Sequence, residues 1–273
     1  MILDTFRLDG KNALVTGSQM GLGKGIALAL AQAGANVGCH GLTPEPNDIC
    51  DDIRKLGRKT FFLYGDVADL KFCSSLIQRT IDELGSIDIL VNNAGTIRRA
   101  PAAEFPQEYW DEVIAVNLTS VFRLSQLAGQ HMLQQGKGKI VNIASLLSFQ
   151  GGVLVPSYAA AKSGVAALTK AFANEWAAKG INVNAITPGY MATDNTAALR
   201  RDQERSRQIL EYNESVPRTA FKEAGNGVID WPKVLRAAAA AGVEHYFVEQ
   251  DQTPGDPVES LRQSFTYLSK LNF

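Results

Sequence analysis

Short runs of apolar residues alternate along the chain with longer stretches in which apolar positions recur at helical spacing. The apolar runs lie at 11–16, 36–41, 60–64, 88–91, 139–144 and 181–186. Helical stretches lie at 24–33, 47–56, 70–84, from about 106 toward 132, and across Tyr158 and Lys162. Because strands and helices alternate in this order, the pattern predicts a doubly wound parallel α/β sheet of the Rossmann-like class.

The first strand runs into a glycine-rich turn, Gly17-Ser-Gln-Met-Gly21-Leu-Gly23, and a helix follows directly. Glycines let the backbone approach a pyrophosphate, and the helix N-terminus adds free N–H groups and the positive end of its dipole. We expect cofactor contacts from Gly17, Ser18, Met20, Gly21, Leu22 and Gly23. The spacing differs from the commoner Gly-x-Gly-x-x-Gly fingerprint, and a glycine turn without a ligand is the alternative.

The end of the second strand bears on the choice of dinucleotide. NAD-binding folds of this kind place an acidic residue there, which accepts hydrogen bonds from the ribose. This chain has Cys39, His40 and Gly41 instead, with no carboxylate for the ribose and no arginine or lysine for a 2′-phosphate. We favour NAD over NADP, although the sequence does not settle the choice. His40 has no clustered partners and is interpreted as a strand-end or loop residue, not a metal ligand.

The fourth strand opens into Asn92-Asn93-Ala94-Gly95. Small and amide residues at the carboxyl end of a strand belong where a nucleotide crosses the edge of the sheet. Asn117 lies farther along in an apolar helical stretch, where the plain interpretation is a buried amide with satisfied hydrogen bonds.

Tyr158 and Lys162 are four residues apart in an Ala-rich stretch that is expected to be helical. Residues at this spacing share one helix face, so the ammonium can approach the phenol, favour phenolate and lower the pKa of Tyr158. A tyrosine that transfers protons near neutral pH needs such a shift. Ser145 ends the strand that precedes this helix. Such pairs also occur by chance, and an amphipathic helix face is the alternative.

Taken together, these motifs resemble the short-chain dehydrogenase/reductase family in order and spacing over residues 1–215. The matching residues are Thr16-Gly-x-x-x-Gly-x-Gly23, Asn92-Asn-Ala-Gly95, Asn117, Ser145, Tyr158-x-x-x-Lys162 and Pro188-Gly189. Three further segments look more narrowly like the 2-deoxy-D-gluconate 3-dehydrogenases. These segments are Ile97-Arg98-Arg99, Ser148-Phe-Gln-Gly-Gly152 and Gly189-Tyr-Met-Ala-Thr-Asp-Asn195.

The resemblance implies an oxidoreductase that transfers a hydride at C3 of a sugar acid with NAD or NADP. Tyr158 would be the acid/base, Ser145 a hydrogen-bond donor to the carbonyl, and Lys162 a cation serving both Tyr158 and the nicotinamide ribose. Asn117 would hold a water in a proton relay. Further implied cofactor contacts are Asp66, Val67, Asn93, Ala94, Gly95, Tyr158, Lys162, Pro188 and Gly189. Arg98, Arg99 and Gln150 are the candidate substrate residues, and exposed loop arginines are the alternative for the first two.

Composition narrows the setting. The formal net charge of −1 offers no basic field for nucleic acid or an anionic membrane, and no apolar run is long enough to span a bilayer. Cys39, Cys50 and Cys73 are unevenly spaced, which indicates neither a disulfide framework nor a zinc site, and we expect no metal. The first residues lack the order of a signal peptide. A cytoplasmic protein that acts on a small sugar acid is expected.

The resemblance to dehydrogenases stops near Asn213. Residues 219–273 look like the last βα segment of a TIM-barrel sugar phosphate isomerase/epimerase, carried by Gly-Val-Ile-Asp-Trp-Pro232 and His245-Tyr-Phe-Val-Glu-Gln-Asp251. We expect a chimera that forms a single Rossmann-like domain over 1–273. In it, helix 231–241 covers the sheet, and strand 244–249 pairs beside strand 181–186 as the seventh strand. Glu249 invites comparison with a metal ligand of the isomerases, but one carboxylate does not make a site.

This exchanged tail leaves a second hypothesis open: a folded hybrid that keeps dinucleotide binding but has little or no catalysis. An isomerase activity from the tail is a third and poorly supported hypothesis, because a barrel site needs loops from several strands.

The resemblance also implies a homo-oligomer. Of the two surfaces that form the family's tetramers, the helices around Tyr158 are kept and the C-terminal strand is replaced, so we expect a dimer.

Overall fold

The computed structural model describes residues 6–44 and 48–189, with Met191, Arg201, Gln263, Thr266 and Tyr267 as isolated positions. Residues 1–196 form one compact unit and 197–273 a second. Each strand and helix with described bounds lies in the first unit. The expected chimera junction, helix 231–241 and strand 244–249 lie outside the described residues, so the single domain and the seventh strand stay predictions.

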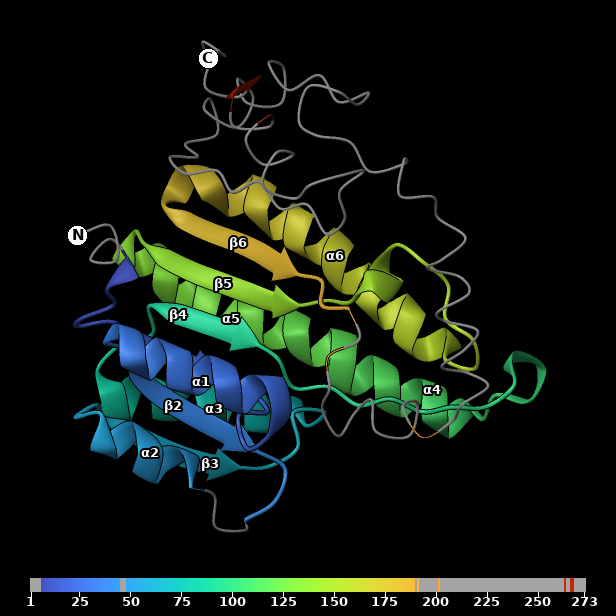
Figure 1. Ribbon diagram of the computed structural model, residues 1–273, viewed down its shortest axis with the longest axis horizontal. Helices are drawn as coiled ribbons and strands as arrows, with labels where there is room; N and C mark the ends of the chain where they lie inside the picture. The colour runs from blue at the N-terminus through green and yellow to red at the C-terminus, as the bar shows by residue number, and fades with distance from the viewer. Residues whose placement is uncertain are drawn as a thin grey trace. The chain divides into compact units, whose positions relative to one another are not determined.

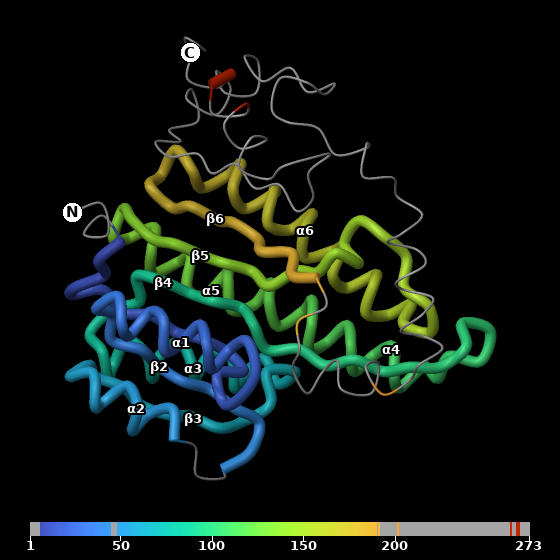
Figure 2. The backbone as a smooth tube through the Cα atoms, in the orientation of Figure 1, coloured from blue at the N-terminus to red at the C-terminus, as the bar shows by residue number. Residues whose placement is uncertain are grey.

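The described strands form one parallel sheet in the order β3-β2-β1-β4-β5-β6 (Figure 1). Their bounds are β1 Asn12–Val15, β2 Asn36–Gly41, β3 Thr60–Tyr64, β4 Ile89–Asn92, β5 Gly138–Ile143 and β6 Ile181–Ile186. After β3 the chain crosses to the other side of β1, and β4 pairs with β1 at the centre of the sheet. Figure 2 shows β2 and β3 on one side of the sheet and β4, β5 and β6 on the other. The predicted Rossmann-like class is confirmed.

Helices cover both faces of the sheet. They are α1 Gly21–Ala33, α2 Ile49–Lys55, α3 Leu70–Leu84, α4 Gln107–Ile114, α5 Ser120–Gln135 and α6 Pro156–Trp176. Alternate side chains of β1 show the division: Ala13 and Val15 pack with α1 and α2, whereas Leu14 packs with α3, α5 and α6. Apolar side chains on both faces explain why the strands read as continuous apolar runs.

Helix ends follow the glycines and prolines in the sequence. Gly34 and Gly85 end α1 and α3 in the left-handed region, at φ 117° and 92°. Pro156 begins α6, where its missing N–H costs nothing. Among the described residues, no helix is long and apolar enough to cross a membrane.

One predicted helix is divided. The stretch from about 106 toward 132 consists of α4, a π-helical turn over Ala115–Thr119, and α5. A π turn inserts one residue into the helical ladder and recurs at functional sites. This turn carries Asn117.

Candidate active site

The glycine-rich turn packs against the segment that follows β4. Asn93 Nδ2 donates hydrogen bonds to the carbonyl oxygens of Thr16 (2.9 Å) and Gly17 (3.1 Å). Thr16 Oγ1 accepts from the backbone N–H groups of Asn93 and Ala94, both at 3.0 Å. A Cβ at Gly23 would collide with the Gly17 carbonyl and the Asn93 amide, so glycine is required there. The ends of two central strands are thereby fixed to each other.

This turn suits a pyrophosphate. Gly17 has φ 62°, and a Cβ there would lie 3.0 Å from Ala94 Cα. The N-cap of α1 is Met20, whose side chain makes no capping hydrogen bond, so no side chain competes for the first N–H groups of the helix. Backbone N–H groups and a cradle that a Cβ would fill are what a dinucleotide needs. The predicted residues Gly17, Ser18, Met20, Gly21, Leu22 and Gly23 all belong to this turn and the start of α1.

The Asn117 side chain connects the π turn to the loop after β4 through two hydrogen bonds. Its Oδ1 accepts from the Thr96 N–H and its Nδ2 donates to the Thr96 carbonyl, each at 2.8 Å. The side chain is fully buried. The interpretation as a satisfied buried amide therefore holds, and Asn117 fixes the backbone next to Gly95. Its role in a water relay stays a prediction.

Ser145 and Lys162 meet through Ser148, which the sequence reasoning did not single out. The Ser145 N–H donates to Ser148 Oγ at 3.3 Å, and Ser148 Oγ donates to the Lys162 carbonyl at 2.7 Å. Ser145 caps the short 3₁₀ turn Leu146–Ser148 and accepts from the Leu147 N–H. The Ser-x-x-Ser spacing of a capping box was the available sequence signal.

Lys162 and Tyr158 lie on one face of α6, as the spacing predicts. The Lys162 Nζ lies 5.6 Å from the centroid of the Tyr158 ring and donates to the Ile143 carbonyl at 2.6 Å. Lys162 is 4% exposed. Burial lowers the pKa of its ammonium to about 8.

The predicted direction of the Tyr158 pKa is wrong for the free protein. Burial raises this pKa above its ordinary value, while Ser145 and the charge of Arg99 act in the opposite direction without overcoming it. Two residues on one helix face fix an approach but not the solvation of either group. Here the loss of water around the phenol outweighs the hydrogen bond with Ser145 and the attraction of Arg99.

The two candidate arginines differ in their surroundings. Arg98 forms a two-pronged ion pair with Glu112 at 2.7 Å and lies 5.7 Å from the centroid of the Tyr109 ring. Arg99 is close enough to Tyr158 for its charge to act on the phenol. Gln150 is exposed, and its backbone N–H donates to the Leu146 carbonyl.

The remaining predicted cofactor residues follow strand ends. Asp66 accepts from the Ala68 N–H just after β3, and Val67 is buried beside it. Pro188 follows β6, and its carbonyl accepts from Leu146 next to Ser145. Gly189 accepts from the Met191 N–H. Among the described ranges, no group of three or more histidine, cysteine or acidic residues could hold a metal ion.

Known proteins resemble this chain over the same region. A 2-dehydro-3-deoxy-D-gluconate 5-dehydrogenase of Escherichia coli (strain K12) is 52% identical over 212 residues, which are 77% of this chain and 83% of the relative. A protein of Agrobacterium tumefaciens, assigned as a 2-deoxy-D-gluconate 3-dehydrogenase and solved with bound NADP, is 53% identical. Its TM-score is 0.69, over 76% of this chain and 82% of that one.

A gluconate 5-dehydrogenase of Burkholderia cenocepacia J2315, solved with NADP and tartrate, has a TM-score of 0.73 at 38% identity, over 77% of this chain and 83% of that one. The sequence model of the short chain dehydrogenases matches residues 11–204. The parallel sheet, the glycine-rich turn between β1 and α1, and the grouping of Ser145, Tyr158 and Lys162 agree with that match. The chain belongs to the short chain dehydrogenase family.

Proposed function

We propose that this protein is an NAD(P)-dependent oxidoreductase that interconverts a secondary alcohol and a ketone on a sugar acid. The observation that carries the proposal is the position of Tyr158, next to Ser145 and one helical turn before the buried Lys162, beyond the end of β5. The named relatives act on sugar acids of this kind, which supports the same substrate class here.

The dinucleotide would lie across the ends of β1 and β4, on the glycine-rich turn and Asn93–Gly95, and its nicotinamide ring would accept or donate the hydride. Residues 39–44, after the middle of β2, carry no carboxylate that would repel a 2′-phosphate. Two neighbouring structures hold NADP. The expected preference for NAD is therefore not supported, and we propose that NADP is accepted as well.

Tyr158 would act as the acid and base that transfers the proton. In oxidation, the substrate hydroxyl gives its proton to the phenolate oxygen as the carbon-bound hydrogen leaves as hydride. In reduction, the phenol returns that proton to the developing alkoxide. Ser145 would donate a hydrogen bond to the same oxygen, where charge develops. Lys162 lies beneath the tyrosine ring and would stabilise its phenolate.

Arg99 is the better of the two candidates for the substrate carboxylate. Arg98 already holds Glu112 through two hydrogen bonds, whereas the charge of Arg99 acts at Tyr158, where the substrate would bind. Carbon 3 is the position that the sequence resemblance implies. Carbon 5 is the second candidate, because it appears in the name of the Escherichia coli relative.

The test compares wild type, Tyr158→Phe and the matched control Tyr64→Phe, which removes an exposed hydroxyl at the end of β3. Turnover is followed by absorbance of the reduced nicotinamide with 2-deoxy-D-gluconate and 2-dehydro-3-deoxy-D-gluconate, and carbon-13 NMR of the product identifies the oxidised carbon. We expect kcat to fall at least about 100-fold in Tyr158→Phe and to be retained in the control. Tyr158→Phe activity within threefold of wild type would refute the acid/base role. Cofactor binding by a wild type that turns over neither substrate would support the hybrid without catalysis.

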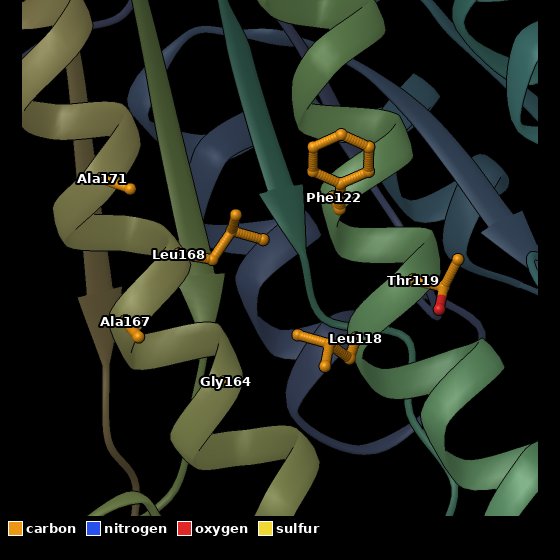
Figure 3. Close-up of a pocket in the computed structure, with 7 residues that line it drawn as sticks. All are labelled: Leu118, Thr119, Phe122, Gly164, Ala167, Leu168 and Ala171. Atoms are coloured by element: carbon orange, nitrogen blue, oxygen red, sulfur yellow. The ribbon is translucent and has the colours of Figure 1, made fainter.

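An apolar groove between α5 and α6 supports the proposed homo-oligomer (Figure 3). It is lined by Leu118, Thr119, Phe122, Gly164, Ala167, Leu168 and Ala171. Phe122 is 42% exposed there, and the small residues of α6 would let a second copy of α5 and α6 approach closely. Light scattering should give the mass of a dimer, and Ala171→Arg should reduce the measured mass to that of a monomer.

A cytoplasmic location remains a prediction.

A further inference from the structure

His40 occupies the end of β2, where many dinucleotide-binding proteins place the acidic residue that holds the ribose. Its side chain does not face solvent: it is 3% exposed and lies against the Phe72 ring, with centroids 5.5 Å apart. The imidazole therefore points into the protein, toward the backbone that forms the cofactor site.

Two hydrogen bonds fix the protonation state of this ring. Nδ1 accepts from the Gly17 N–H at 3.0 Å, so it carries no proton. Nε2 lies 3.0 Å from the Gly65 carbonyl oxygen, which can only accept, so Nε2 carries the proton. The backbone of His40 is also bonded to Ser18, by N–H to Oγ at 2.9 Å and by carbonyl to the Ser18 N–H at 2.8 Å.

We propose that His40 is a positioning residue of the dinucleotide site: its neutral imidazole joins the glycine-rich turn to the end of β3 and holds Gly17 in its binding conformation. The inference rests on the proposed function, because it requires that the turn bind a dinucleotide. Gly17 begins the turn that is expected to bind the pyrophosphate. Gly65 precedes Asp66, which is an expected cofactor contact. The His40 side chain therefore connects two segments of the expected dinucleotide site.

Protonation of His40 at acidic pH would break the hydrogen bond between the Gly17 N–H and Nδ1. A proton on Nδ1 would face the Gly17 N–H with a second donor, and the hydrogen bond would be lost. The charged group that acts on the ring is Asp66, in the loop between β3 and α3, and its carboxylate favours the protonated ring. Burial outweighs it and lowers the pKa of His40 below its ordinary value. The neutral ring therefore predominates at pH 7, and the link weakens only as the pH falls below about 6.5.

The test measures the affinity for NADPH and NADH by fluorescence titration in wild type, His40→Leu, His40→Asn and the control His131→Asn on α5. His40→Leu removes the acceptor, and we expect its dissociation constant to rise about tenfold with kcat at saturating cofactor unchanged. The Asn Oδ1 can replace Nδ1, so His40→Asn should stay within threefold of wild type. Wild-type affinity should fall as the pH is lowered below 6.5 and His40 takes up a proton, more steeply than that of His40→Asn.

A purely structural role would lower the melting temperature of His40→Leu and leave its affinity for cofactor intact, and that result would overturn the inference. So would nitrogen-15 NMR that places the proton on Nδ1 in the wild type, a measurement that needs no variant to fold. If wild type binds neither cofactor, the proposed function and this inference both fall. If wild type binds and His40→Leu binds equally well, only the inference falls.

Discussion

The buried ammonium of Lys162 should make the free protein less stable than a variant that lacks it. Its pKa of about 8 is roughly 2.5 units below the ordinary value of 10.5. At 1.36 kcal/mol per unit, burying this charge costs about 3 kcal/mol at pH 7. Lys162→Met removes that cost but leaves the Ile143 carbonyl without its 2.6 Å donor, which costs about 1–3 kcal/mol. We expect a net gain in stability of about 1 kcal/mol, together with loss of activity.

The pH dependence gives the sharper signature. Below pH 8 the lysine is protonated in both folded and unfolded chains, and the full cost applies. Between pH 8 and 10.5 the folded chain has lost the proton that the unfolded chain still binds, so wild-type stability gains about 1.4 kcal/mol per pH unit from this group. Above pH 10.5 the lysine is neutral in both states, and burying it no longer lowers the stability of the folded chain. The stability of Lys162→Met should not show this rise between pH 8 and 10.5.

Urea denaturation of the cofactor-free protein, followed by tryptophan fluorescence at pH 7 and pH 9.5, measures both effects. Lys170→Met is the matched control, because Lys170 is exposed on the same helix and its removal should change stability by less than about 0.5 kcal/mol. The reasoning is refuted if Lys162→Met is less stable than wild type at pH 7 and the difference between them is the same at pH 9.5.

Three further substitutions test the contacts around the site. Ser148→Ala removes the hydroxyl that bonds the Ser145 N–H and the Lys162 carbonyl, and it should lower kcat about three- to tenfold in steady-state assays. An unchanged kcat would show that Ser148 does not position these residues. Asn117→Leu leaves both polar groups of the loop after β4 unpaired and should cost about 2–4 kcal/mol in urea denaturation, and a cost below about 0.5 would contradict this. Gly23→Ala overlaps the Gly17 carbonyl and should weaken NADPH binding at least about tenfold in titrations. Gly25→Ala, with open space around the added methyl, is its control and should bind normally.

The positions of the strands along the chain were predictable because their signals are local and repeated. The apolar runs at 36–41, 60–64 and 181–186 coincide with strands, and Gly34 and Gly85 end helices where the sequence predicts. Both faces of a parallel sheet are buried, which leaves a continuous apolar run in the sequence. The π turn was not predictable, since its residues Ala115–Thr119 have the same apolar character as a regular helix.

Site residues can be found by motif, but their interactions cannot. The Ser-x-x-Ser spacing around Ser148 indicates a capping box with Ser145, but it does not show that Ser148 also bonds the backbone of Lys162. His40 reads as an ordinary strand-end residue, because no pattern in the sequence tells which backbone atoms its ring contacts. Spacing along one helix shows which residues share a face, whereas hydrogen bonds between distant segments depend on how the strands align.

Burial also affects the protonation of Tyr158, which matters differently for the two directions of the proposed reaction. A raised pKa keeps Tyr158 as a phenol at neutral pH, which is the state that donates a proton during reduction. Oxidation needs the phenolate, so the same burial opposes it until a cation or an alkaline pH compensates. Lys162 holds its Nζ on the Ile143 carbonyl, and Arg99 is the charge that acts on the phenol. In the proposed reaction, the free site therefore holds Tyr158 in the form that donates a proton during reduction, and oxidation depends on the charges that are brought beside Tyr158 when ligands bind.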